Sequence, residues 1–406
     1  MSASSPSSGH LNARIGTLLT AVEQLDGLLD RTREAGKSLP SSHELSVIAR
    51  RHKPVLAKML EPVRRELIAL REPTESSISD RWSRTQWCTQ QLDQLSAELL
   101  PVAEGALARA AGLDGGLCST AQRLLDDLGA MTVPWNRIVI PAPHEATSTR
   151  SWVVGLPLLD TSPWHLPIMV HELGHFAATR LEDQYNRRLG AELLDGSWRE
   201  RPNVSSMKQE MLAPMSRKHA QELFADVFSV YCVGPAFGAS LITRAIPGDS
   251  PAVSPTHPSW AVRMHAVLRT FSRLDDLVPE VNENLSWITD WITEEWESAQ
   301  SAAGHTEIPI ALRTSVDAFT DGAIDVMELT GSKALFRGED VLQTGELLRE
   351  GVPPDGEADP RTVLNAAWAE RLRDQEKTTT IQRALVQWRI AGLGRSATDV
   401  SLDGAP

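Results

Sequence analysis

Residues 166–178 read LPIMVHELGHFAA, and His171 and His175 stand four positions apart within this stretch. Residues four apart lie on the same face of a helix, so both imidazoles can bind one metal ion. Glu172 lies about 100° further around the helix, close enough to take a proton from a water at the metal without being a ligand. The apolar residues on both sides indicate a buried helix. A buried pair of histidines needs a partner, and a metal ion is the commonest one.

A catalytic zinc ion takes three protein ligands and keeps a fourth position for water, so a third ligand is required. A longer motif with a third histidine on the same segment is excluded, because the relevant positions are Ala178 and Leu181. Residues 218–228 read KHAQELFADVF and predict a second buried helix, on which Glu222 and Asp226 share a face. An unpaired carboxylate pair on such a face would be costly. We therefore predict Glu222 as the third ligand.

Two residues near Glu222 have predicted roles at the same site, Asp226 as a residue that orients a ligand and His219 as a rival ligand. Asp226 lies one turn beyond Glu222, where it can accept the N–H of a ligating histidine and fix its tautomer. His219, three residues before Glu222, is a rival for the third ligand position. Cys232 lies about 15 Å along the helix from Glu222, which is too far to share the metal.

Three motifs in the chain, HELGH at 171–175, ELFAD at 222–226 and HPSWAVR at 257–263, follow in the order seen in gluzincin metallopeptidases. The chain resembles above all the HtpX/CAAX-prenyl-endopeptidase superfamily, which shows Glu-x-x-Ala-Asp and a later His-Pro-x-x-x-x-Arg. ImmA-type peptidases are similar through the first motif and Ala-Asp-x-Phe, but the His-Pro element fits them less well. The resemblance covers residues 137–268, about a third of the chain.

The resemblance implies a zincin-like core that binds one Zn²⁺ ion through His171, His175 and Glu222, with Glu172 as the general base. It also places His257 and Arg263 near the cleft. The expected activity is that of a soluble zinc metallopeptidase acting on a peptide or protein substrate.

His257 is the predicted donor to the oxyanion that forms during hydrolysis, with His265, Tyr185 and Tyr231 as rivals. An equally weighted interpretation has the His257 imidazole capping the start of a helix locally. Arg263 can pair with a carboxylate near the site or form an ordinary surface salt bridge.

Two other functions stay open. One is a zinc hydrolase of a non-peptide amide. The other is a non-catalytic regulatory or binding protein that keeps zinc as a structural staple, and the helical flanks are possible surfaces for a protein partner. The membrane helices of the CAAX-type enzymes are missing, so membrane substrates and prenylated substrates are not expected.

The composition excludes some classes of partner and compartment. The chain has 406 residues, a net charge of −13 and a pI near 5.4. Because nucleic acid is itself negatively charged, it is not the expected partner. The three cysteines are widely separated and indicate a reducing compartment, so we expect a cytoplasmic protein. Residues 1–10 are expected to form a disordered tail. The apolar stretch Leu223–Ile246 contains Gly234-Pro235 near its middle, which predicts two buried helices rather than a membrane span.

The hydrophobic periodicity predicts a mainly α protein with a small β-sheet, an α+β class. We expect an N-terminal helical domain over 11–128, a zincin-like metallopeptidase core over 129–275 and a C-terminal helical domain over 276–400. The runs 137–141 and 152–157 predict strands. Residues 152–156 are either an edge for an extended peptide substrate or simply a core strand. Residues 182–210 are either a lid or wall of the site or an ordinary surface excursion.

Overall fold

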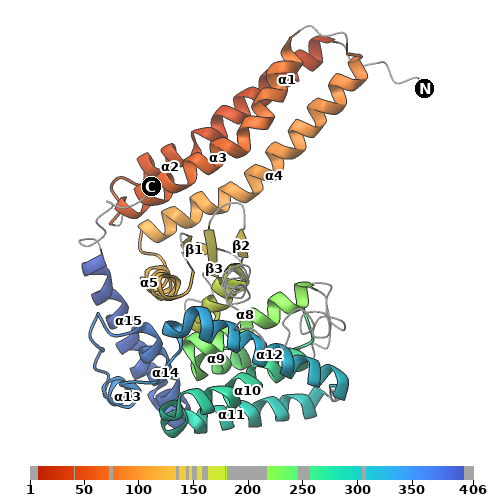
Figure 1. The fold of residues 1–406 in the computed structure, drawn as a ribbon. Coiled ribbons are helices and arrows are strands. Elements are labelled where there is room, and N and C mark those ends of the chain that lie inside the picture. The colour runs from red at the N-terminus through yellow and green to blue at the C-terminus, as the bar shows by residue number, and fades with distance from the viewer. Residues whose placement is uncertain are drawn as a thin grey trace, which may run out of the picture. The chain divides into compact units, whose positions relative to one another are not determined.

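The computed structural model describes residues 8–40, 42–72, 76–133, 137–142, 146–148, 153–157, 163–178, 180, 217–245, 257–303 and 308–396. Most of these residues are helical, and three short strands form one sheet (Figure 1). The prediction of a mainly α protein with a small sheet is therefore confirmed. The chain divides into two compact units, unit 1 with Met1–Cys118 and Arg137–Leu159, and unit 2 with Ser119–Asn136 and Asp160–Pro406.

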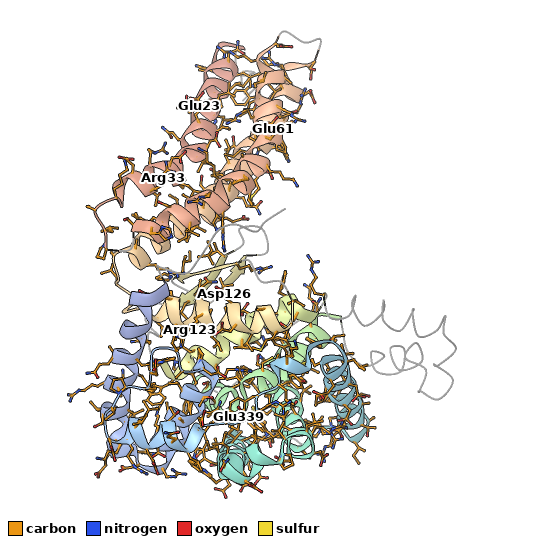
Figure 2. The ribbon with its side chains drawn as sticks, turned by 60° about the vertical axis from the view of Figure 1, so that its left-hand side comes forward. Glu23, Arg33, Glu61, Arg123, Asp126 and Glu339 are labelled. Carbon is orange, nitrogen blue, oxygen red and sulfur yellow. The ribbon has the colours of Figure 1, made fainter. Side chains whose placement is uncertain are left out.

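Unit 1 is built on α1 (Ser8–Asp26), α2 (Leu28–Ala35), α3 (Ser42–Arg71) and α4 (Ile78–Ala110). Apolar residues at steps of three and four give each of the long helices one buried face, while charged residues such as Glu23 and Arg33 lie on the exposed faces (Figure 2). These faces form one hydrophobic core, which includes Leu11, Ile15, Val22, Leu56, Leu60, Leu67, Cys88, Leu92 and Leu99.

The sheet of unit 1 contains β1 (Ile138–Ala142), β2 (Ala146–Ser148) and β3 (Val153–Pro157) in the order β1-β3-β2. β1 and β3 are parallel, and β2 and β3 are antiparallel. The sequence predicted β1 and β3 but not β2, which is too short to show an alternating pattern. The prediction that residues 152–156 offer an edge to a substrate is wrong, because β3 is the central strand and its backbone pairs with a neighbour on each side.

Helix α4 packs closely against β1. A Cβ atom added to Gly105 would lie 2.3 Å from the carbonyl oxygen of Pro141, so only glycine permits this approach. Four residues further on, the buried side chain of Arg109 donates a hydrogen bond of 2.5 Å to the carbonyl oxygen of Val139. The sheet therefore belongs to the N-terminal helices of unit 1.

Unit 2 contains most of α5 (Leu117–Met131), the 3-10 helix η2 (Pro163–Ile168), a helix over 169–178, and α8 (Arg217–Val233), α9 (Pro235–Ala245), α10 (Trp260–Leu277), α11 (Pro279–Ala303) and α12 (Ile310–Gly331). It continues with η4 (Ser332–Ala334), α13 (Val341–Arg349), α14 (Pro360–Arg373), η5 (Gln375–Lys377) and α15 (Thr378–Ser396). α8 packs against α9, α10 and α12, and all its residues from Glu222 onward are buried.

The break between α8 and α9 was predicted from Gly234-Pro235 and is confirmed. Gly234 has a φ of 76°, a conformation that suits glycine, and the helix restarts at Pro235. The buried side chain of Asn365 bridges the break, because it accepts from the Ala236 N–H at 2.9 Å and donates to the Val233 carbonyl at 2.6 Å. Among the described residues, no helix is long and apolar enough to cross a membrane.

Helices α9 and α14 contact η2, which leads directly into the helix over 169–178. The carbonyl oxygen of Trp164 accepts hydrogen bonds from Ser240 Oγ at 2.5 Å and from Trp368 Nε1 at 3.2 Å. The guanidinium of Arg371 lies 4.7 Å from the Trp164 ring and 4.8 Å from the Trp368 ring. α9 and α14 thus fix the entry to the helix that carries His171.

The compact units do not follow the predicted segments. The strands group with the N-terminal helices, and the C-terminal helices group with the helix over 169–178. The predicted boundaries of 11–128, 129–275 and 276–400 describe segments that would fold independently. Grouping by contacts does not test independent folding, so these boundaries stay a prediction.

We predict that unit 1 loses stability in acid because of the buried His52. This side chain is buried in α3, and its Nε2 has no hydrogen-bond partner among the described residues. Burial, helped by the charge of Arg51, lowers the pKa of His52 from 6.5 to about 4. The unfolded chain therefore binds a proton that the folded chain does not, and stability falls as the pH falls from about 6.5 to about 4, by up to about 3 kcal/mol.

His52→Leu should reduce this loss, measured as the free energy of urea unfolding at a series of pH values. His43→Leu, at an exposed position of the same helix, should leave the loss in place. Equal pH dependence in wild type and His52→Leu would contradict the prediction.

Candidate metal centre

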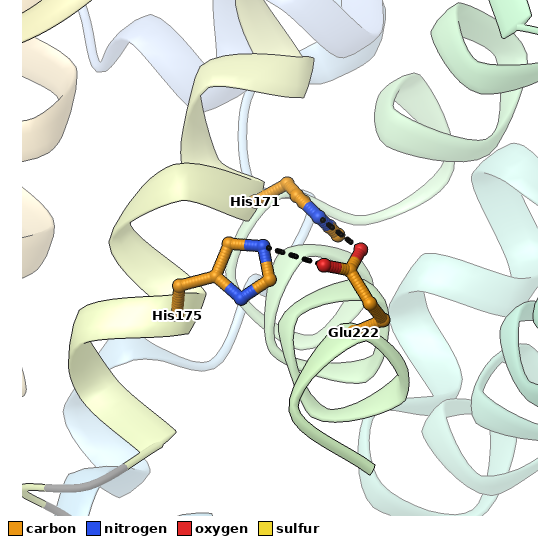
Figure 3. A group of neighbouring side chains, drawn as sticks. All are labelled: His171, His175 and Glu222. Atoms are coloured by element: carbon orange, nitrogen blue, oxygen red, sulfur yellow. Dashed lines mark ion pairs between the residues drawn. The ribbon is translucent and has the colours of Figure 1, made fainter. Parts of the chain in front are cut away.

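Two helices of unit 2 bring three metal-ligating side chains together. His171 and His175 come from the helix over 169–178, and Glu222 comes from α8 (Figure 3). One donor atom from each residue lies within 4.8 Å of the others. The structure thus places the three predicted ligands at one point, and this group can bind a metal ion.

The two helices cross at Gly174 and Ala225. A Cβ atom added to Gly174 would lie 2.7 Å from the Ala225 Cα atom and 3.1 Å from its Cβ atom. Since Gly174 lies between the two histidines and Ala225 lies between Glu222 and Asp226, the crossing brings the four polar side chains within reach. Sequence analysis missed this role, although a glycine inside a buried helix is a signal of close packing.

Two of the donor distances are close to the spacing around a small metal ion. Nε2 of His171 lies 3.3 Å from Oε2 of Glu222, and Nε2 of His175 lies 3.4 Å from Oε1. With metal–ligand bonds of about 2.0–2.1 Å, two donors at the corners of a tetrahedron lie roughly 3.3–3.4 Å apart. The donors also fit a cation chemically, because Oε2 of Glu222 is buried and has no hydrogen-bond donor among the described residues.

The charges around the site favour a positive ion. Burial lowers the pKa of His171, but Asp226 and Glu222 together outweigh it and raise this pKa to about 9. Burial and the charge of His171 lower the pKa of His175 to about 4. Burial raises the pKa of Glu222, yet its close contact with the charge of His171 brings it below its usual range. The two carboxylates hold a proton on His171 that a metal ion can replace, so metal binding releases protons.

Asp226 is 0% exposed and connects His171 to Arg263. Its Oδ1 lies 2.9 Å from Nδ1 of His171, which leaves Nε2 of that ring facing Glu222. Arg263 donates to both oxygens of Asp226, from Nε to Oδ2 and from Nη2 to Oδ1, each at 2.7 Å. The surface-salt-bridge interpretation of Arg263 is therefore wrong, because its partner is a buried carboxylate beside the site.

The two predicted catalytic residues come from different segments of unit 2. Glu172 is half-buried on the helix that carries both histidines. His257 lies just before α10, with its side chain 54% exposed and its Nε2 3.5 Å from Oε1 of Glu222. Ser259 is the N-cap of α10 and accepts from the Val262 N–H at 3.4 Å, and the choice between the catalytic and the capping role of His257 stays a prediction.

The rival residues have other places in the structure. His219 is not part of the group of clustered donor atoms among the described residues. Nε2 of His265 lies 2.7 Å from Asp317, and the hydroxyl of Tyr231 donates to Glu328. Tyr185 and the candidate lid at 182–210 lie outside the described residues.

Comparisons of the chain with protein-family models, with curated proteins and with solved structures found no match. A function for this protein therefore rests on the chemistry of the site itself.

The crossing at Gly174 predicts an unusual response to a single methyl group. Gly174→Ala should lower both the melting temperature and the affinity for zinc, because the added Cβ atom meets backbone atoms of Ala225 and pushes the helices apart. Gly16→Ala is the matched control, since its added Cβ atom meets nothing within 4 Å.

A helical Gly→Ala change without a clash stabilises by about 0.5–1 kcal/mol, so the control should raise the melting temperature. Thermal unfolding and zinc titration of both variants check the prediction. Unchanged zinc affinity in a folded Gly174→Ala variant would contradict it.

Glu222→Ala should abolish stoichiometric zinc binding, while His219→Ala keeps it. Loss of a ligand should exceed the roughly 10–100-fold effect that is typical of residues that only orient ligands. Zinc content after dialysis, measured by elemental mass spectrometry, checks both variants. The reverse result would assign the third ligand to His219.

Proposed function

We propose that this protein is a zinc metallopeptidase with a zincin-like core built on the helix over 169–178 and α8. The observation that supports it most is the convergence of His171, His175 and Glu222 within 4.8 Å, with Glu172 next to His171 on the same helix. A structural metal site needs only ligands, whereas a hydrolase also needs a base beside them. We assign that second role to Glu172.

The donor set favours zinc among the common divalent ions. Imidazole nitrogens suit zinc better than magnesium or calcium, which prefer oxygen ligands. Two histidines and one carboxylate are also a common ligand set of catalytic zinc sites that leave one position open. When bound, zinc supplies Lewis acidity, which acidifies water and polarises a carbonyl oxygen.

The chain's own residues then carry the proton. The Glu172 carboxylate accepts a proton from the attacking water, whose oxygen forms a bond to the carbonyl carbon of the substrate. The same carboxyl group donates the proton to the amide nitrogen as the C–N bond breaks. One group serves both steps, and the products are a carboxylic acid and an amine.

His257 is the proposed donor to the developing oxyanion. Its side chain is largely exposed, and its Nε2 lies 3.5 Å from the Glu222 carboxylate, so the ring borders the site from the solvent side. A donor of this kind contributes about 10²–10³-fold to the rate in other hydrolases. The substrate of this proposal is a peptide or protein in the cytoplasm.

A second candidate function is a non-catalytic protein with a closed metal site, and the same position of His257 favours it. If His257 completed the ligand set, four protein ligands would close the site, as in structural zinc centres. The two candidates differ in the metal content of His257→Ala. The hydrolase keeps its zinc in this variant, and the closed site loses much of it.

Glu172→Gln should retain about one zinc ion per chain and lose hydrolysis of peptide substrates by more than about 10²-fold, because glutamine cannot accept the proton. The measurement combines elemental mass spectrometry with cleavage of a peptide library by the wild-type protein. His171→Ala, which removes a ligand, should lose both metal and activity.

Full activity in Glu172→Gln would contradict the role of this residue as the base. Absence of zinc from the wild-type protein, even after zinc is supplied and the excess removed, would contradict the metal centre and the peptidase together.

A further inference from the structure

The carboxylate of Asp226 lies at the centre of a buried polar chain that runs from α10 to the metal-binding helix. Oδ1 is shared, because it accepts from Nη2 of Arg263 at 2.7 Å and lies 2.9 Å from Nδ1 of His171. Oδ2 accepts from Nε of Arg263 at 2.7 Å. The guanidinium of Arg263 therefore fixes the orientation of the Asp226 carboxylate. That orientation determines where Oδ1 lies relative to Nδ1 of His171.

A buried carboxylate requires such a partner. An isolated charge at a fully buried position is strongly unfavourable, while a guanidinium that donates two parallel hydrogen bonds compensates the charge and fixes its direction. Lysine lacks this planar geometry. Burial raises the pKa of Asp226, but the charge and hydrogen bonds of Arg263, with those of His171, bring it far below its usual range.

Arg263 is itself held in place. The guanidinium lies 4.6 Å from the ring of Trp260, one turn earlier on α10. Ser259 caps the start of this helix, so Arg263 falls on its first turn, directly opposite α8. Its side chain is about nine-tenths buried. The arginine is therefore a fixed element of the site.

We propose that Arg263 is a positioning residue for the metal centre, acting through Asp226. By fixing the carboxylate, Arg263 holds the Nδ1–H tautomer of His171 and keeps the Nε2 lone pair directed at the metal position. This inference rests on the proposed metal centre but not on peptidase activity. An ion pair that only joined α8 and α10 would affect stability and leave the metal affinity of the folded protein unchanged.

Arg269 supplies a matched control on the same helix. It donates to both oxygens of Asp321, from Nε at 3.0 Å and from Nη2 at 2.7 Å, so its geometry resembles that of the Arg263 pair. Its partner lies on α12, and neither residue belongs to the metal cluster. A general effect of losing a two-bond arginine pair from α10 would therefore show up equally in Arg269→Gln.

The experiment measures zinc affinity by competition with a chromophoric chelator and records the absorption spectrum of the Co²⁺ form. Arg263→Gln should lower zinc affinity about 10–100-fold and alter the Co²⁺ bands, because residues that orient ligands have effects of this size. Arg263→Lys should recover part of the affinity, and Arg269→Gln should match wild type in both readouts.

A double-mutant cycle keeps the proposal testable if one variant is unstable. Asp226→Asn should lower zinc affinity by itself, and adding Arg263→Gln to it should cause little further loss, because the arginine acts through the carboxylate. Wild-type affinity in folded Arg263→Gln, or full additivity in the double variant, would overturn the role of Arg263. A wild-type protein that binds neither Zn²⁺ nor Co²⁺ would overturn the metal centre first, whereas metal binding without hydrolysis would overturn only the peptidase.

Discussion

The close crossing of two helices at Gly174 and Ala225 is the constraint on which the site depends. Two donors come from one helix and one from the other, and they converge within 4.8 Å where the two backbones approach most closely. A glycine inside a helix is less favourable than alanine by about 1 kcal/mol. At this position the missing side chain allows an approach that any larger residue would prevent, and the stability lost to backbone entropy is offset by packing along α8.

The buried position of α8 explains the polar network around it. Both carboxylates of this helix, Glu222 and Asp226, lie among apolar neighbours and require partners from other elements. Both oxygens of Asp226 accept hydrogen bonds from Arg263, while Oε2 of Glu222 has no hydrogen-bond donor among the described residues. Of the two carboxylates, the one with unused acceptor capacity is therefore the one that faces both imidazoles. This asymmetry supports the proposed metal centre.

Much of the fold could be predicted because its signals are local. Apolar residues at helical spacing gave the helices, and Gly234-Pro235 gave the break between α8 and α9. The grouping of elements could not be predicted, because it depends on contacts far apart in the chain. Trp368 bonds the carbonyl of Trp164 from 204 residues further along, and no local pattern indicates that pairing. For the same reason the order of the strands, with β3 in the centre, was missed.

The sequence by itself determined that His171 and His175 share one helix face, since that relation follows from the pitch of the α-helix. It also indicated Glu222 and Asp226 as polar residues on an apolar helix. Only the tertiary structure decided that these carboxylates meet the histidines, that His257 borders Glu222, and that Arg263 pairs with a buried partner. The physical reason is that spacing along one helix is fixed by backbone geometry, whereas the meeting of separate helices depends on how closely their side chains let them pack.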